Sequence, residues 1–311
     1  MDDDPHNPIN SETASATAHY LSDNEQKHLQ HMPGTNGQTF GTVNPELLRA
    51  MAEGVTPYLP QLAGADGEGG FNASGVESFK SQDQMASMFS VFDQDHKSGI
   101  MITNAAFDQQ HHLQVNAAET GNYRGEMFAE RLHSAVVAGA ERAETYDREH
   151  KQFVDSERYN NAGANWDKVS SATSALGAIP PLAAPAAVAS VLSPIFKDAM
   201  INPNDPSAIQ GDDYLTRHFE AAHNNTVNSD NAAILRGLMN ANPAMATDPA
   251  VERYLTNGQL DPAKFRGDGT PGSGLDFNFD ALAERWGFKA GIWSARENKG
   301  EDAGKSWEDD D

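Results

Sequence analysis

The segment from Phe92 to Ile100 contains the residue types of a calcium-binding loop. In an EF-hand, acidic residues at loop positions one and three and an aliphatic residue at position eight surround the ion. Asp93, Asp95 and Ile100 occupy these positions. The rest of the loop departs from the pattern, because the glycine comes one position late and the final glutamate is missing. We therefore expect an acidic turn before the next helix and no metal site there.

Two histidines flanking a glutamate, His218, Glu220 and His223, suggest the helix of a zinc protease. That motif needs histidines one turn apart, whereas these are separated by about 140° around a helix. A polar surface helix is the better interpretation, and a hydrolase using His218 or Glu220 is the least supported class of function. His28 and His31 share a helix face, but no third ligand accompanies them.

Serine nucleophile elbows, phosphate-binding glycine loops and dinucleotide fingerprints are missing from the sequence. The sequence contains no cysteine, which excludes disulfides, thiolate metal sites and cysteine nucleophiles. We therefore expect a protein that is not an enzyme, with no catalytic residues, no cofactor and no metal ligands.

Helix starts are signalled repeatedly by Asn or Asp followed by Pro, which fits the first position of a helix. The pairs are Asn44-Pro45, Asp205-Pro206, Asn242-Pro243, Asp248-Pro249 and Asp261-Pro262. Strand patterns are nearly missing, and Ile100-Met101-Ile102 is the closest candidate for part of one small hairpin. These features predict an all-α fold.

The longest predicted helix runs from about Asn122 to Tyr159. Its apolar stripe at 3.6-residue spacing consists of Phe128, Leu132, Ala135, Gly139, Ala143, Tyr146 and Phe153. The opposite, polar face contains Glu126, Glu130, Glu141, Glu144, Arg148 and Asp155. Small residues in the stripe permit close approach of a neighbouring helix, so we expect this helix to be the centre of a helical bundle.

Further helices are predicted near 11–31, 44–63, 78–92, 102–118, 206–222, 229–241 and 276–298, each bounded by Gly, Pro, Asn or Asp. The predicted organisation is a polar N-terminal segment with a helix (1–40), a helical core domain (41–265), a glycine-rich linker (266–274), and a C-terminal helix with an acidic tail (275–311).

An Ala/Pro-rich stretch from Val169 to Phe196 contains no charged residue. Its length alone permits a membrane span, but Pro180-Pro181, Pro185 and Pro194 interrupt it. We expect two short helices buried as an apolar hairpin, with conditional insertion into a membrane as the alternative.

The charge of the chain restricts its partners. With 22 Lys and Arg against 45 Asp and Glu, the formal net charge is −23, which repels phosphate backbones and anionic lipid. Nucleic acid is therefore excluded as a partner, and a protein of unknown identity is expected. The opening Met1-Asp2-Asp3-Asp4-Pro5 carries no Sec signal peptide, although a cut inside a longer protein would also produce such a start.

Residues 40–260 resemble a protein family, on the strength of Asn44-Pro45-Glu46-Leu47-Leu48-Arg49, then Phe92-Asp93-Gln94-Asp95, then the long helix and the Ala/Pro-rich stretch. The sequence is similar to actinobacterial "TPR repeat region" proteins, which are associated with type VII secretion. This resemblance implies an all-α, non-enzymatic protein that is secreted or located in the cell envelope. The secretion signals Trp-x-Gly and Tyr-x-x-x-Asp/Glu are missing, which would make the chain a fragment or a partner of a secreted protein.

Two functions follow from these observations. The leading hypothesis is a non-enzymatic helical interaction protein of the secretion or envelope apparatus. The alternative is a toxin-like effector whose hairpin at 169–196 inserts into membranes.

Overall fold

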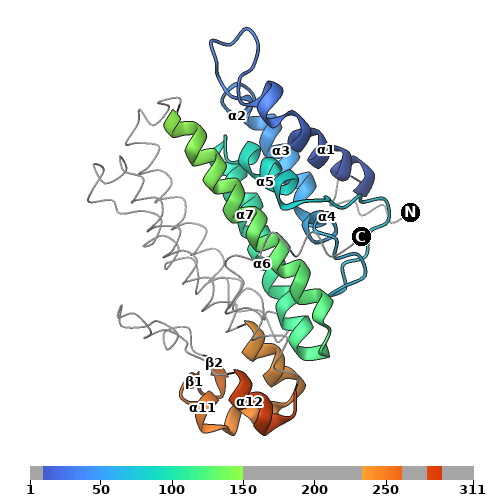
Figure 1. Ribbon diagram of the computed structural model, residues 1–311, viewed down its shortest axis with the longest axis vertical. Coiled ribbons are helices and arrows are strands. Elements are labelled where there is room, and N and C mark those ends of the chain that lie inside the picture. The colour runs from blue at the N-terminus through green and yellow to red at the C-terminus, as the bar shows by residue number, and fades with distance from the viewer. Residues whose placement is uncertain (1–9, 150–232, 261–278, 289–311) are drawn as a thin grey trace, which may run out of the picture. The chain divides into compact units, whose positions relative to one another are not determined.

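The computed structural model describes residues 10–149, 233–260 and 279–288 (Figure 1). Most of these residues are helical, and the strands among them are two segments of two residues each. The all-α class predicted from the sequence is therefore confirmed. The predicted helix at 206–222, the apolar stretch 169–196, the linker 266–274 and the acidic tail lie outside the described residues.

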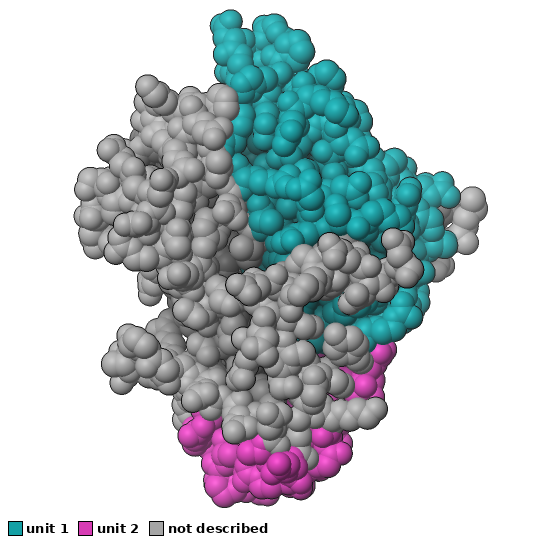
Figure 2. All heavy atoms as spheres, viewed as in Figure 1, with its two compact units in different colours: residues 1–113, 124–153, 298–311 teal, residues 114–123, 154–297 magenta. Residues whose placement is uncertain are grey.

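The chain divides into two compact units (Figure 2). Unit 1 comprises residues 1–113, 124–153 and 298–311, and unit 2 comprises residues 114–123 and 154–297. The helix expected in the polar segment 1–40 packs inside unit 1 with the helices that follow it.

The first helix of unit 1, α1 (Ser11–Asn24), begins at a polar cap. The Asn10 side chain accepts a hydrogen bond from the Thr13 amide (2.8 Å), which satisfies an amide that the helix itself leaves unpaired. A π-helical turn, η1 (Glu25–Leu29), extends α1. Together they confirm the helix predicted at 11–31.

The helix predicted at 44–63 is present in three consecutive pieces. These are α3 (Pro45–Val55), a 3-10 turn, η2 (Thr56–Tyr58), and α4 (Leu59–Leu62), and the short helix α2 (Phe40–Val43) precedes them. The interruptions coincide with Pro57 and Pro60, because proline lacks the amide hydrogen that a continuous helix requires.

α1 packs against α5 (Gln82–Phe92) and α3 (Figure 1). Its buried residues are Ala14, Ser15, Ala18 and Leu21, which recur every three or four positions and therefore lie on one face of the helix. Thr13, Ala16 and Tyr20 belong to the other face and are exposed. α1 thus contributes one face to the core and presents the other to the surface.

Two long helices complete the described part of unit 1, α6 (His96–Thr120) and α7 (Tyr123–Glu149), although the last turns of α6 belong to unit 2. α6 begins six residues before the predicted 102–118. The prediction of a strand at Ile100-Met101-Ile102 is wrong, because these residues lie inside α6. A capped helix start at Asp95 and burial of Ile102 within unit 1 outweigh the β preference of the two isoleucines.

The predicted apolar stripe of α7 is buried at most of its positions. Phe128, Leu132 and Ala135 are at most 1% exposed, and Tyr146 is also buried, while Phe153 lies outside the described residues. Glu126 was expected on the exposed polar face but is only 4% exposed, so that prediction is wrong for this residue. Ala129 and Val136, which flank the stripe, are buried as well, so α7 is covered on more than one face.

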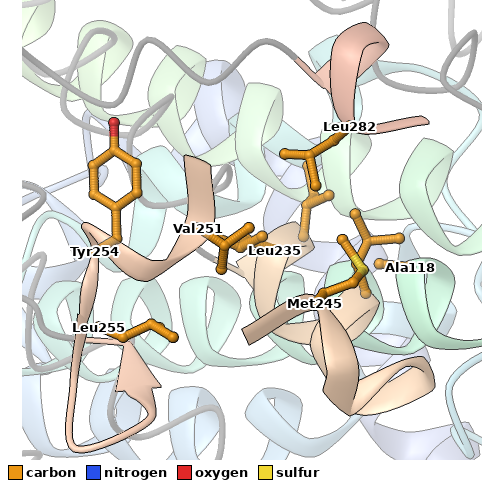
Figure 3. Packing of buried hydrophobic residues seen from close by; sticks show 9 residues of the cluster. Ala118, Leu235, Met245, Val251, Tyr254, Leu255 and Leu282 are labelled. Carbon is orange, nitrogen blue, oxygen red and sulfur yellow. The ribbon is translucent and has the colours of Figure 1, made fainter. Parts of the chain in front are cut away.

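Unit 2 contains short elements. Residues 233–241 are helical, as predicted for 229–241, and α12 (Phe279–Trp286) lies within the predicted 276–298. The 3-10 turn η4 (Pro243–Thr247) and α11 (Pro249–Glu252) start at two of the predicted Asn/Asp-Pro pairs. Their core is formed by nine buried residues (Figure 3): Ala118, Ile234, Leu235, Leu238, Met245, Val251, Tyr254, Leu255 and Leu282.

A hairpin of β1 (Leu255–Thr256) and β2 (Gln259–Leu260) follows α11. The strands are antiparallel, with Leu255 opposite Leu260. The two residues between the strands, Asn257 and Gly258, have φ values of 55° and 78°, which is the left-handed backbone that a tight type I′ turn requires.

Hydrogen bonds of the Asp248 side chain link α12 to α11. Its carboxylate caps α11 by accepting the Ala250 amide (2.9 Å), and it also accepts the indole N–H of Trp286 (2.8 Å). Burial works to raise the pKa of Asp248, but these bonds and the charge of Arg285 outweigh it, so the pKa lies below its ordinary value. The ionised carboxylate therefore holds two elements of unit 2 together.

Candidate interaction surface

The acidic turn from Asp93 to Asp95 is a structural junction. Both carboxylate oxygens of Asp95 are bound by Arg49, whose Nε and Nη2 donate at 2.8 and 2.7 Å. Asp95 also caps α6 by accepting the Ser98 amide (3.0 Å). The neighbouring Gln94 side chain accepts the Gly41 amide (3.1 Å). The two Asp95 oxygens that an EF-hand would offer to calcium are therefore engaged by donors of the chain itself.

Chelation should leave this junction intact. Within residues 10–149, 233–260 and 279–288, no group of three or more His, Asp or Glu side chains is arranged to hold a metal ion. We expect dialysis against EDTA to change the thermal unfolding midpoint by less than the error of the measurement, because the donors to Asp95 are protein groups. A fall in the midpoint that calcium or zinc restores would contradict this account.

The two histidines predicted to share a helix face have separate surroundings. The Nδ1 atom of His31 lies 2.6 Å from the Tyr146 hydroxyl, which also lies 2.7 Å from the Gln30 carbonyl oxygen. His28 is exposed. His31 thus takes part in a contact between the end of η1 and α7. His218, Glu220 and His223 lie outside the described residues.

The described part of the chain contains no helix that is long and apolar enough to cross a membrane. The stretch 169–196, on which the prediction of membrane insertion rests, is not among those residues.

A hollow of about 420 Å³ lies between α1 and α3, and we call it the α1–α3 groove. It is lined by Glu12, Thr13, Ala16, Thr17, Tyr20 and Met51. The five residues of α1 belong to the face that points away from the core, and Met51 comes from the adjoining face of α3. The groove therefore follows from the way α1 and α3 pack side by side (Figure 1).

Large apolar side chains are exposed along this surface. Tyr20 is 53% exposed, and Leu47, one helical turn before Met51 on α3, is 49% exposed. Val43, at the end of α2, is 38% exposed. The contacts of α2 with η1, and of η2 with α1, show that α1 and α3 run antiparallel, which places Leu47 toward the Tyr20 end of α1. Exposed apolar residues grouped around a hollow are typical of binding surfaces.

The charges on these two helices are mainly negative. α1 contains Glu12 and Asp23 and has no Lys or Arg. α3 contains Glu46 and Glu53, and its single arginine, Arg49, is bound to Asp95 and Glu46. The α1–α3 groove thus combines an apolar floor with acidic surroundings.

The sequence predicts both helices but not which of their exposed faces meet at this surface. The signal is present in α3, where Leu48, Ala52 and Val55 form the buried stripe while Leu47 and Met51 form a second apolar stripe beside it. When the apolar face of a helix is wider than its packing against the core requires, the additional apolar residues indicate a second binding contact.

Comparisons of the chain with protein-family models, with curated proteins and with solved structures found no match.

Proposed function

We propose that the chain is a non-enzymatic helical interaction protein of the secretion or envelope apparatus, and that it binds a protein partner through the α1–α3 groove. The observation that carries this proposal is that Tyr20 and Met51 line a surface hollow in unit 1, with the exposed Leu47 one helical turn before Met51 on α3. The assignment to secretion or the envelope is supported by the resemblance of residues 40–260 to "TPR repeat region" proteins.

We propose that α7 is the central helix of a helical bundle and that the Ala/Pro-rich stretch 169–196 forms an apolar hairpin within it. The burial of Phe128, Leu132 and Ala135 supports the central position of α7. The lack of charge in 169–196 supports a buried location for the hairpin.

A pull-down from the source cell tests the proposed function. The baits are the full chain, the variant Tyr20→Asp, and Met101→Asp as the matched control. Met101 is an exposed apolar residue on α6, 37% exposed, and does not line the groove. We expect a partner that the wild type and Met101→Asp retain and that Tyr20→Asp loses. Recovery of no protein by the wild type would contradict the proposal.

The alternative function is a toxin-like effector whose hairpin 169–196 inserts into membranes, and the uncharged sequence of this stretch favours it. Leu182→Asp and Val191→Asp distinguish the two. If the hairpin is buried, each variant should lose about 3 kcal/mol of unfolding free energy or more, because an unpaired carboxylate enters a core. Intact unfolding midpoints combined with lost co-sedimentation with anionic liposomes would favour the effector.

A further inference from the structure

We infer that the occupant of the α1–α3 groove is an amphipathic helix with a basic polar side, supplied by a partner protein. This inference rests on the proposed function and adds the chemistry of the partner to it. Three properties of the groove lead to it: the spacing of its lining residues, the size of their side chains, and the sign of the surrounding charges.

The spacing favours a helix. The lining residues of α1 include Thr13, Ala16, Thr17 and Tyr20, which follow the i, i+3, i+4, i+7 pattern of one helix face. Such a row forms the ridges and grooves into which the side chains of a second helix fit. α1 has no free strand edge to offer, so an extended peptide would lack main-chain partners on it.

The side-chain sizes allow close approach. Thr13, Ala16 and Thr17 are small, and axes of packed helices come within about 8–10 Å when the contact residues are small. Tyr20 and Met51 supply larger apolar surfaces beside them. Tyrosine is among the residue types that most often dominate binding energy, because it buries a large area with little loss of rotamer freedom. An incoming leucine or isoleucine would contact small residues below and Tyr20 and Met51 beside it.

The negative charges near the groove determine which charged residues the polar side of the partner helix should carry. Glu12 lines the groove, and Asp23, three residues after Tyr20 on α1, is exposed. Arg49 does not offset them, because Asp95 and Glu46 already bind it. Lysines and arginines on the partner would be attracted, whereas an acidic helix would be repelled. A second copy of this chain, with its formal charge of −23, is disfavoured for the same reason.

Two synthetic peptides test the inference on the full chain. The first is a fluorescein-labelled amphipathic helix of about 18 residues, or five turns, with leucine and alanine on one face and lysine and arginine elsewhere. The second is identical except that glutamate replaces every lysine and arginine. Fluorescence anisotropy measures their affinity at several salt concentrations. We expect the basic peptide to bind and the acidic peptide to bind at least about tenfold more weakly.

The variants separate docking in the groove from general attraction to an acidic protein. Tyr20→Asp removes an apolar contact and adds a negative charge, and Met101→Asp makes the same kind of change on α6. If only charge mattered, both variants would bind the basic peptide slightly more tightly. Docking in the groove predicts that Tyr20→Asp weakens binding at least about tenfold while Met101→Asp does not. Both residues are exposed, so neither variant should unfold the protein, which circular dichroism verifies.

A charge variant tests the acidic surroundings separately. Glu12→Gln combined with Asp23→Asn should weaken binding of the basic peptide several-fold and reduce the dependence of its affinity on salt. Equal binding of both peptides, or equal responses of Tyr20→Asp and Met101→Asp, would overturn the inference. Dimerisation of the wild type that Tyr20→Asp abolishes would assign the groove to a second copy instead, and Tyr20-dependent binding to anionic vesicles would assign it to lipid.

The pull-down distinguishes failure of this inference from failure of the proposed function. If neither peptide binds, but a cellular partner is captured in a Tyr20-dependent way, the chemistry inferred for the occupant is wrong and the interaction function stands. If the wild type captures no partner and binds no peptide, both fail.

Discussion

Asp95→Ala should lower the free energy of unfolding of unit 1 by about 2–4 kcal/mol. The substitution removes the cap of α6, which is worth about 0.5–2 kcal/mol, and leaves Arg49 without its most buried partner. The side chain of Asp95 is only 9% exposed, so water does not replace the lost contacts fully. Chemical denaturation of the full chain, followed by far-UV circular dichroism, measures the loss.

Glu46→Ala is the matched control, because Glu46 binds the same arginine from the surface. Its side chain is 84% exposed, and an ion pair so exposed contributes less than about 1 kcal/mol. We therefore expect little change in this variant. Equal losses in Glu46→Ala and Asp95→Ala would contradict the central role of Asp95.

The contribution of Asp95 should also depend on pH. Burial works to raise the pKa of Asp95. The hydrogen bonds from Arg49 and Ser98 and the positive charge of Arg49 outweigh this effect and lower the pKa. A carboxyl group whose pKa is lower in the folded state contributes its full stabilisation above the unfolded pKa of about 4. The stabilisation is lost as the pH falls through the folded pKa. The difference between wild type and Asp95→Ala should therefore be constant near neutral pH and shrink below about pH 4.

Gly139→Val should destabilise unit 1 by about 3 kcal/mol. A Cβ atom at position 139 of α7 would lie 2.5 Å from the Cβ atom of Phe89 and 2.9 Å from the Ala86 carbonyl oxygen on α5. These are backbone or backbone-proximal atoms, which cannot move aside as the end of a flexible side chain can. The helices must therefore separate, with loss of packing around Phe89.

Ala140→Val provides the control for Gly139→Val. It introduces the same β-branched residue in the same turn of α7, at a half-buried position, and should cost less than about 1 kcal/mol. Chemical denaturation of both variants compares them directly. Similar losses would show that valine is unfavourable in this helix for reasons other than the approach of α5.

Periodicity and capping residues predicted most helices of the described chain, because both signals are local. The apolar stripe through Phe128, Leu132 and Tyr146 predicted α7, and Asn44-Pro45 predicted the start of α3. The sequence predicts the start of α6 six residues late. The Asp95 cap that begins this helix lies in the acidic turn predicted before it. Its bond to Arg49 joins positions 46 residues apart, which no local pattern reveals.

Two other features were missed for different reasons. The hairpin carries a local signal, since Asn257-Gly258 between two residue pairs that each contain a leucine favours a type I′ turn, but the β-branched residues at 100–102 give a stronger strand signal. The burial of Glu126 and the exposure of Tyr20 and Leu47 depend on which helix faces find neighbours. Helix packing determines this, so the α1–α3 groove became visible only in three dimensions.

Photo-crosslinking in the source cell tests the central claim most directly. The photoreactive residue p-benzoylphenylalanine is placed at position 20, in the α1–α3 groove, or at position 101 on α6 as the control. We expect irradiation to attach one protein to position 20 through a basic helical segment, identified by mass spectrometry of the crosslinked peptide, and to attach no such protein at position 101. The absence of a crosslink at position 20, or the same crosslinks at both positions, would contradict the proposal that the groove binds a partner.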